Sequence, residues 1–255
     1  MRSVAPSALL APFVRDFMLV DVRDETTRVR LPEPGLVLGV RYRGSASLLA
    51  GDEATRLADA TLTGMTITAR RMRTAAGSGI ILARFHPGGA ARFFAEPLHQ
   101  LFGGTVALDD LLPRGEVDRI RGDVTEAASD CARVAALEAF LRARLPPRPP
   151  DPVVAAAVRA ISEARGAVRI RTLARQLGIS QDPLEKRFRR AVGATPKQLA
   201  SLLRLRHAID SYRPGARLTQ LALDAGYSDQ SHFNRELRAV TGEAPGRFLR
   251  AGQYR

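Results

Sequence analysis

The segment LARQLGIS at residues 173–180 recurs as LALDAGYS at residues 221–228. Each copy predicts the end of a short helix, a glycine in the left-handed conformation, an apolar turn residue and a serine that caps the next helix. This order of elements is typical of a helix-turn-helix. The second copy follows the first at an offset of 48 positions up to the serine.

The correspondence continues beyond the serine at an offset of 49 positions. The matched positions are Leu184 and Phe233, Phe188 and Leu237, Gly193 and Gly242, and Pro196 and Pro245. One repeated Leu-Ala pair could arise by chance, but an ordered set of apolar, glycine and proline positions in register indicates a duplicated unit.

The charge of the chain follows the repeat. The 255 residues carry a net charge of +13, with a pI of about 11.2. Residues 151–255 hold 19 Lys+Arg and 9 Asp+Glu, whereas residues 1–150 hold 20 and 17. A compositional bias toward arginine explains why Lys186 and Lys197 are the sole lysines of the basic segment, but it does not explain the asymmetry. The repeat therefore predicts an anionic partner.

Several classes of protein fit the sequence poorly. No apolar run approaches the roughly 18 residues of a membrane span, and the first 17 residues make a poor signal peptide. We therefore expect a cytoplasmic protein with no membrane partner. The single cysteine, Cys131, excludes an intramolecular disulfide and a cysteine-rich metal site. Its alanine-rich helical surroundings predict a small buried side chain.

The N-terminal part of the chain is rich in strand signals. Short β-prone segments at 17–20, 36–42, 46–49, 61–68 and 80–85 are separated by Gly, Pro and Asp, which predicts a small barrel or sandwich. From Val117 to Leu145, apolar residues recur at three- and four-residue steps, as in a helix. We expect this helical stretch to pack on the β part or on a second subunit.

A proline-rich segment divides the chain. Residues 146–150 read PPRPP and predict a stiff linker, and Asp151-Pro152 has the pattern of a helix cap followed by the first helical residue. We expect an α+β protein of two domains. A β-rich, barrel- or sandwich-like domain with C-terminal helices spans 1–145, a linker spans 146–151, and an all-α domain with two helix-turn-helix units spans 152–255.

The apolar stripes decide which residues of the repeat face outward. The helix after Ser180 buries Leu184, Phe188 and Val192, and its counterpart after Ser228 buries residues 233, 237 and 240. Amide side chains pair with adenine, Arg and Lys pair with guanine, and Ser pairs with either base. The expected base-reading residues are Gln181, Asp182, Glu185, Lys186, Gln230, Ser231, Asn234 and Arg235.

Other basic residues of this segment suit the DNA backbone, where contacts set affinity rather than sequence preference. They are Arg169, Arg171, Arg189, Arg190, Lys197, Arg204, Arg217, Arg238 and Arg247. A helix at about 196–212, capped by Thr195, joins the units and spans about 25 Å. Adjacent major grooves lie about 34 Å apart. Full engagement should therefore bend the DNA, which circular-permutation gel shifts can measure.

The repeat also resembles a known family. Residues 153–250 are similar to the AraC/XylS-type DNA-binding domain, above all through LALDAGYSDQSHFNR at 221–235, followed by Thr241-Gly242 and Pro245. The first copy fits this family too. It departs at Asp182-Pro183 and Glu185, where the family often has basic or amide residues, and an acidic Asp182 beside phosphates is repulsive.

The resemblance implies a transcription regulator, usually an activator, that binds double-stranded promoter or operator DNA. It adds RNA polymerase, an unidentified small-molecule effector and a second copy of the chain as candidate partners. Residues 1–145 resemble the uncharacterised sensor domains found ahead of such DNA-binding domains, through FHPGGA at 85–90 and LDDL at 108–111. That resemblance implies a sensor or dimerisation module and names no ligand.

No catalytic constellation is present in the sequence, so we expect no enzyme, catalytic residue, metal or cofactor. His86 and His99 lack the close spacing of a metal site, and His86 before Pro-Gly-Gly is typical of a strand end. Surface arginines are often a solvated face, but two units in register on a basic segment favour DNA. The alternatives are a β-barrel enzyme fused to a DNA-binding domain and a non-specific architectural DNA binder. Turnover assays and sequence-selective enrichment of DNA discriminate among them.

Overall fold

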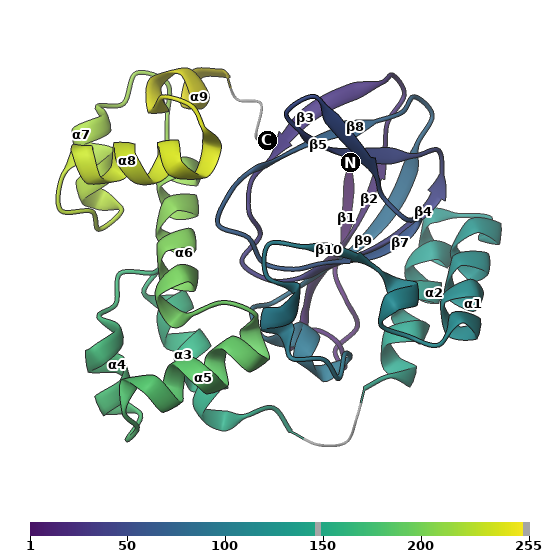
Figure 1. Cartoon of the computed structure of the whole chain (residues 1–255), viewed down its shortest axis with the longest axis horizontal. Coiled ribbons are helices and arrows are strands. Elements are labelled where there is room, and N and C mark those ends of the chain that lie inside the picture. The colour runs from purple at the N-terminus through teal and green to yellow at the C-terminus, as the bar shows by residue number, and fades with distance from the viewer. Residues whose placement is uncertain (146–148, 252–255) are drawn as a thin grey trace.

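A computed structural model describes residues 1–145 and 149–251 of the chain. A β-rich domain with helices lies beside an all-helical C-terminal region, in which α6 stands upright between two smaller groups of helices (Figure 1). The expected fold class is confirmed. The expected linker at 146–151 lies outside the described residues at positions 146–148.

The β-rich domain contains two antiparallel sheets. The first runs in the order β1 (Arg2–Val4), β2 (Val14–Asp21), β9 (Gly79–Phe85), β4 (Val37–Arg43), β7 (Ala60–Thr63) and β10 (Thr105–Ala107). The second runs in the order β3 (Thr26–Arg30), β8 (Arg70–Thr74), β5 (Ala46–Ala50) and β6 (Glu53–Arg56). No strand pairing joins them within the described residues, so the domain is sandwich-like rather than a closed barrel.

The second sheet is the part of the fold that the sequence predicted least well. β3 and β8 consist mainly of Arg and Thr, and β6 is exposed along its whole length, so hydrophobic patterning does not reveal these three strands. The expected strand at 61–68 is too long, because β7 ends at Thr63. Short 3₁₀ turns, η1 (Gly89–Arg92), η2 (Leu98–Leu101) and η3 (Leu108–Asp110), follow the strands.

Two helices pack on the first sheet where one stretch was expected. These are α1 (Arg114–Glu126) and α2 (Asp130–Ala143). A new helix begins after α1 because Ser129 caps α2 by accepting a hydrogen bond from the Ala132 N–H at 3.2 Å. The prediction that Cys131 is buried is wrong. Its side chain is exposed, because the buried stripe of α2 consists of residues 134, 137 and 141.

The C-terminal region follows the expected order of helices. These are α3 (Pro152–Glu163), α4 (Ile170–Gln176), α5 (Gln181–Val192), α6 (Pro196–Ser211), α7 (Leu218–Asp224), α8 (Gln230–Thr241) and α9 (Pro245–Ala251). Asp151 caps α3 through the Val153 and Val154 N–H groups, at 3.0 and 3.2 Å. Thr195 and Gln198 form a reciprocal capping box at the start of α6. Both predicted caps are confirmed.

We call α5 and α8, the second helix of each helix-turn-helix unit, the recognition helices. The serine caps expected for them are wrong in detail. Ser180 precedes α5, but its side chain makes no capping hydrogen bond. At α8 the cap is Asp229, whose Oδ1 accepts a hydrogen bond from the His232 N–H at 2.7 Å. Ser228 instead donates its hydroxyl to Asp229 Oδ2 at 3.0 Å. A carboxylate is favoured there by the positive end of the helix dipole and by the strength of a charged acceptor.

Burial confirms the predicted stripe of α5 and two of the three positions predicted for α8, where Val240 is half-buried rather than buried. Leu184, Phe188 and Val192 are fully buried on α5, as are Phe233 and Leu237 on α8. The α5 stripe belongs to one apolar core that runs continuously into the β-rich domain. The α8 stripe forms a second, smaller core with residues of α6, α7 and α9, against which Leu31 of the β-rich domain packs.

The C-terminal ends of both recognition helices touch the β-rich domain. A Cβ added to Gly193, at the end of α5, would lie 3.1 Å from the Leu98 carbonyl oxygen of η2. At the end of α8, the Val240 carbonyl accepts a hydrogen bond from the Ala69 N–H at 2.7 Å. The β-rich domain thus contacts both duplicated units at equivalent places.

The glycines that end α5 and α8 allow a matched test of this contact. Gly193 and Gly242 both have positive φ, at 91° and 76°. Alanine at either position should cost about 1–2 kcal/mol of unfolding free energy for the left-handed backbone. Space is open around Gly242, so we expect Gly193→Ala to cost more than Gly242→Ala in denaturant unfolding. Equal losses would contradict the contact with Leu98.

Asp229 provides a pH-dependent test of the cap. The hydrogen bond from the His232 N–H, with that from Ser228, holds the pKa of Asp229 below its ordinary value of 3.8. Because the folded pKa is depressed, its stabilising effect is complete above that ordinary value and is lost as the pH falls through the folded pKa. We expect the advantage of the wild type over Asp229→Asn, which keeps a cap but does not titrate, to shrink as the pH falls. Thermal unfolding midpoints between about pH 6 and pH 2.5 measure it. A constant difference would contradict the cap.

Candidate nucleic-acid interface

The first recognition helix presents the expected face to solvent. Gln181, Asp182 and Lys186 are exposed, and Glu185 is half-buried. The side-chain amide of Gln181 donates a hydrogen bond to Glu185 Oε1 at 3.1 Å. Two of these four side chains carry negative charge, so the face is less suited to the electronegative groove than its counterpart on α8.

The second recognition helix combines exposed and half-buried candidates. Ser231 and Arg235 are exposed, whereas Gln230 and Asn234 are half-buried. Gln230 Oε1 accepts a hydrogen bond from the Thr219 hydroxyl of α7, which leaves its amide group free to donate. Asn234 Oδ1 is buried and has no hydrogen-bond partner among the described residues.

The N-terminal turns of α5 and α8 both point away from the β-rich domain (Figure 1). This arrangement follows from the contacts at their opposite ends, where Gly193 meets Leu98 and Val240 meets Ala69. The expected base-reading residues lie mainly on these turns. The β-rich domain therefore contacts the C-terminal ends of α5 and α8 and leaves uncovered the N-terminal turns, which a helix-turn-helix presents to DNA.

Most of the expected phosphate contacts lie on the surface. The exposed ones are Arg169, Arg171, Arg189, Arg190, Lys197, Arg217, Arg238 and Arg247. Arg204 differs, because its side chain is 19% exposed and its Nη2 lies 3.4 Å from Glu236 Oε2. Its guanidinium also stacks on Tyr227, 4.7 Å from the ring centroid. The structure thus uses Arg204 to fasten α6 to the second unit, which the spacing of basic residues could not reveal.

A cluster of charges that the sequence did not single out joins α6 to the β-rich domain. Glu33, in the loop between β3 and β4, lies 2.9 Å from Arg15 Nη2 and 3.6 Å from Arg206 Nη1. Arg206, on α6, also donates a hydrogen bond to the Pro32 carbonyl at 2.7 Å. This loop therefore binds the connecting helix directly.

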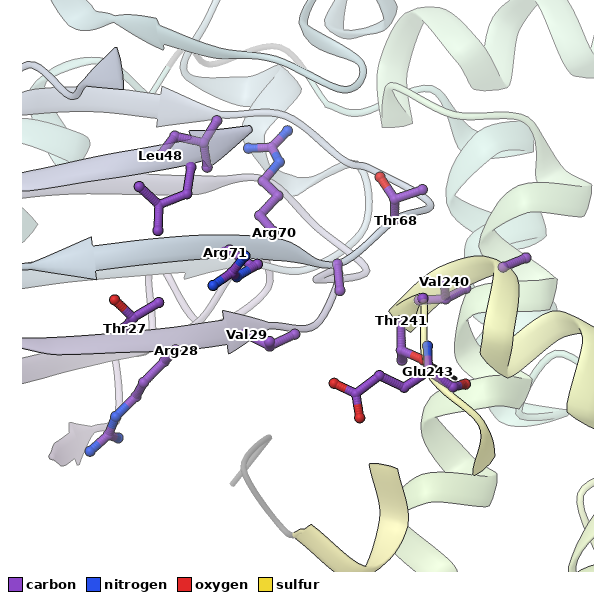
Figure 2. A pocket seen from close by; sticks show the side chains of 14 residues that line it. Thr27, Arg28, Val29, Leu48, Thr68, Arg70, Arg71, Val240, Thr241 and Glu243 are labelled. Carbon is purple, nitrogen blue, oxygen red and sulfur yellow. Dashed lines mark hydrogen bonds between the residues drawn. The ribbon is translucent and has the colours of Figure 1, made fainter. Parts of the chain in front are cut away.

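A groove of about 680 Å³ marks the seam between the second sheet and the end of α8. Arg28, Arg70 and Arg71 line its strand side, and Glu243 projects its carboxylate toward the strands from the turn after α8 (Figure 2). The seam is therefore polar on both sides, apart from a few aliphatic residues such as Val240.

The described residues contain no group of three or more His, Cys, Asp and Glu side chains placed to hold a metal ion. In the same part of the chain, no helix is long and apolar enough to cross a membrane. His86 directly follows β9, as expected, and its backbone N–H donates to the Phe13 carbonyl at 2.8 Å. Burial lowers the pKa of His86, and the nearby charge of Arg15 adds to this effect.

Comparison with known families finds matches to two parts of the chain. Residues 173–251 match the family described as "Helix-turn-helix domain", and residues 2–107 match "Domain of unknown function (DUF6597)". A search of curated proteins found no match.

Three solved structures illustrate the similarity. ToxT from Vibrio cholerae is 12% identical, with 91% of this chain and 97% of that chain covered and a TM-score of 0.49. An AraC-type regulator from Chromobacterium violaceum is 25% identical, with 40% and 92% covered and a TM-score of 0.36. A probable AraC family regulator from Rhodopseudomonas palustris is 33% identical, with 37% and 95% covered and a TM-score of 0.31.

Three observations indicate the same function, which is DNA binding. They are the two helix-turn-helix units, their exposed N-terminal turns and the family match at 173–251. The chain is a DNA-binding transcription regulator that carries an AraC-type helix-turn-helix domain at its C-terminal end, behind a β-rich domain whose family has no assigned function.

Proposed function

We propose that this regulator engages promoter or operator DNA with both units at once, inserting α5 and α8 into successive major grooves. The observation that carries this proposal is that a single continuous helix joins two equivalent units. With 16 residues, α6 is about 24 Å long, which is shorter than the roughly 34 Å between adjacent major grooves. The duplex must therefore bend toward the protein for both helices to enter fully.

Within this complex, α8 reads bases more directly than α5. Its candidates, Gln230, Ser231, Asn234 and Arg235, are neutral or basic, whereas α5 places Asp182 and Glu185 beside Gln181 and Lys186. The carboxylates of Asp182 and Glu185 are repelled by nearby phosphates, although each carboxylate can accept a hydrogen bond from cytosine. The seven exposed arginines described above and Lys197 contact phosphates and set the salt dependence of binding.

The β-rich domain acts as the sensing module of the regulator. Its contacts with α5, α6 and α8 support this role, because a change within the domain would reach both DNA-binding units. We place the domains at 1–145 and 152–255, with the linker at 146–151. In this proposal, a non-enzymatic cytoplasmic activator responds to a small-molecule effector, acts on RNA polymerase and can pair with a second copy.

Arg235→Ala should weaken binding to the preferred site by about 1–3 kcal/mol and relax base preference at one position, because it removes a bidentate donor to guanine. In-vitro selection of bound sequences, followed by fluorescence anisotropy on the selected site, measures both effects. Unchanged base preference in the variant would remove Arg235 from the reading set.

Arg238→Ala is the matched control, since it removes an exposed arginine three residues further along the same helix. We expect it to weaken binding about equally for all sequences and to reduce the slope of log K against log salt by about 1. A change of base preference in Arg238→Ala, with none in Arg235→Ala, would reverse the assigned roles.

A further inference from the structure

Both recognition helices begin with a glutamine, and the structure holds the two side-chain amides by opposite ends. Gln181, the first residue of α5, and Gln230, the first residue of α8, correspond at the offset of 49 positions. Oε1 of Gln230 accepts a hydrogen bond from the Thr219 hydroxyl at 2.5 Å. Nε2 of Gln181 instead donates to Glu185 Oε1 at 3.1 Å. Since the side chain is the same in both units, its neighbours decide which end of the amide is held.

Two differences in sequence between the units account for this contrast. Thr219 lies on α7 at the position that Arg171 occupies on α4, at the offset of 48. Asn234 lies on α8 at the position that Glu185 occupies on α5, at the offset of 49. The second unit therefore lacks the carboxylate that receives the glutamine amide in the first unit. It supplies instead a hydroxyl that donates to the glutamine oxygen.

Packing keeps Thr219 and Gln230 at this distance. Ala222 of α7 and Phe233 of α8 are buried in the same apolar core. Tyr227, in the turn between the two helices, lies edge-on to Phe233 with 5.3 Å between the ring centroids. Threonine is also stiff at its first side-chain dihedral, because it is branched at Cβ. The hydroxyl that holds Gln230 therefore has a fixed place in the second unit.

The hydrogen bond from Thr219 limits what Gln230 can read. An amide pairs with adenine through two bonds at once, in which its nitrogen donates to N7 and its oxygen accepts from the N6 amino group. The bond to Thr219 holds Oε1 of Gln230 toward α7 and leaves the Nε2 group to donate. In the major groove, guanine presents the acceptors N7 and O6, and thymine presents the acceptor O4. A donor alone therefore matches guanine or thymine better than adenine.

This restraint becomes stronger in the complex with DNA. In the free protein Thr219 is exposed and Gln230 is half-buried, so water competes for the hydroxyl and for the amide. A recognition helix in the major groove excludes much of this water, and a hydrogen bond is stronger where the dielectric is lower. One hydrogen bond of ordinary net strength changes the ratio of two bases about fivefold.

We infer that Thr219 is a positioning residue for base recognition, which fixes the amide of Gln230 so that α8 selects guanine or thymine, rather than adenine, at the base that Gln230 contacts. The inference rests on the proposed function, for which it names the class of base at one position of the DNA site.

In-vitro selection of bound sequences with the full chain tests this role. The wild type and Gln230→Ala together locate the base, which is the position where Gln230→Ala loses preference. Thr219→Val replaces the hydroxyl by a methyl group of similar shape, and it should raise adenine relative to guanine or thymine at that position about fivefold. Thr219→Ser keeps the hydroxyl and should select like the wild type. Gln220→Ala is the control on the same helix and should leave the preference unchanged, because the Gln220 amide donates to Asp224 of α7 at 2.7 Å.

The double variant Thr219→Val with Gln230→Ala separates positioning from any other role of Thr219. If Thr219 acts through Gln230, the double variant should have the base preference of Gln230→Ala alone, and a difference between them would overturn the inference. It would also be overturned if Gln230→Ala changed no preference, if the wild type selected adenine at this position, or if Thr219→Val selected like the wild type. A wild type that enriched no sequence would contradict the proposed function itself, whereas each of these results in a selective protein contradicts the inference alone.

Discussion

The attachment of both recognition helices to the β-rich domain at their C-terminal ends is the constraint that organises this molecule. The apolar stripe of α5 continues into the core of that domain, and Val240 at the end of α8 accepts a backbone hydrogen bond from Ala69. Between these two points, Arg206 ties α6 to the loop at Pro32 and Glu33. The spacing of the reading helices is therefore set jointly by α6 and by the domain behind it.

A single loop links the first sheet of the β-rich domain to the helix that joins the DNA-binding units. The loop that holds Arg206 leads directly into β4, and β4 carries Arg41. Positive charge is used in different ways along this route. Arg204 and Arg206 hold helices together, and Arg41 is buried beside Asp59 with its Nε and Nη1 atoms lacking a hydrogen-bond partner among the described residues. Most other basic residues of the helical region, by contrast, stay exposed for an anionic partner.

Local patterns predicted the features of the helical region that depend on neighbours in sequence. The apolar stripe at 184, 188 and 192 and the caps at Asp151 and Thr195 are confirmed. Helical periodicity and capping depend on residues only a few positions apart, so the local sequence is enough to predict them. Features that depend on distant partners were missed. The burial of Arg204 requires Tyr227 and Glu236, and β8 requires two neighbouring strands to satisfy an arginine-rich segment.

The same reason explains what could not be foreseen about the candidate sites. The outward faces of α5 and α8 follow from their stripes, whereas the anchoring of α6 by Arg206 depends on the Pro32 carbonyl, 174 positions earlier in the chain. Hydroxyl-radical footprinting on a DNA site selected in vitro tests the two-groove account most directly. It predicts two protected tracts on one face of the duplex, about 10 base pairs apart. A single protected tract, or protection that does not depend on sequence, would contradict it.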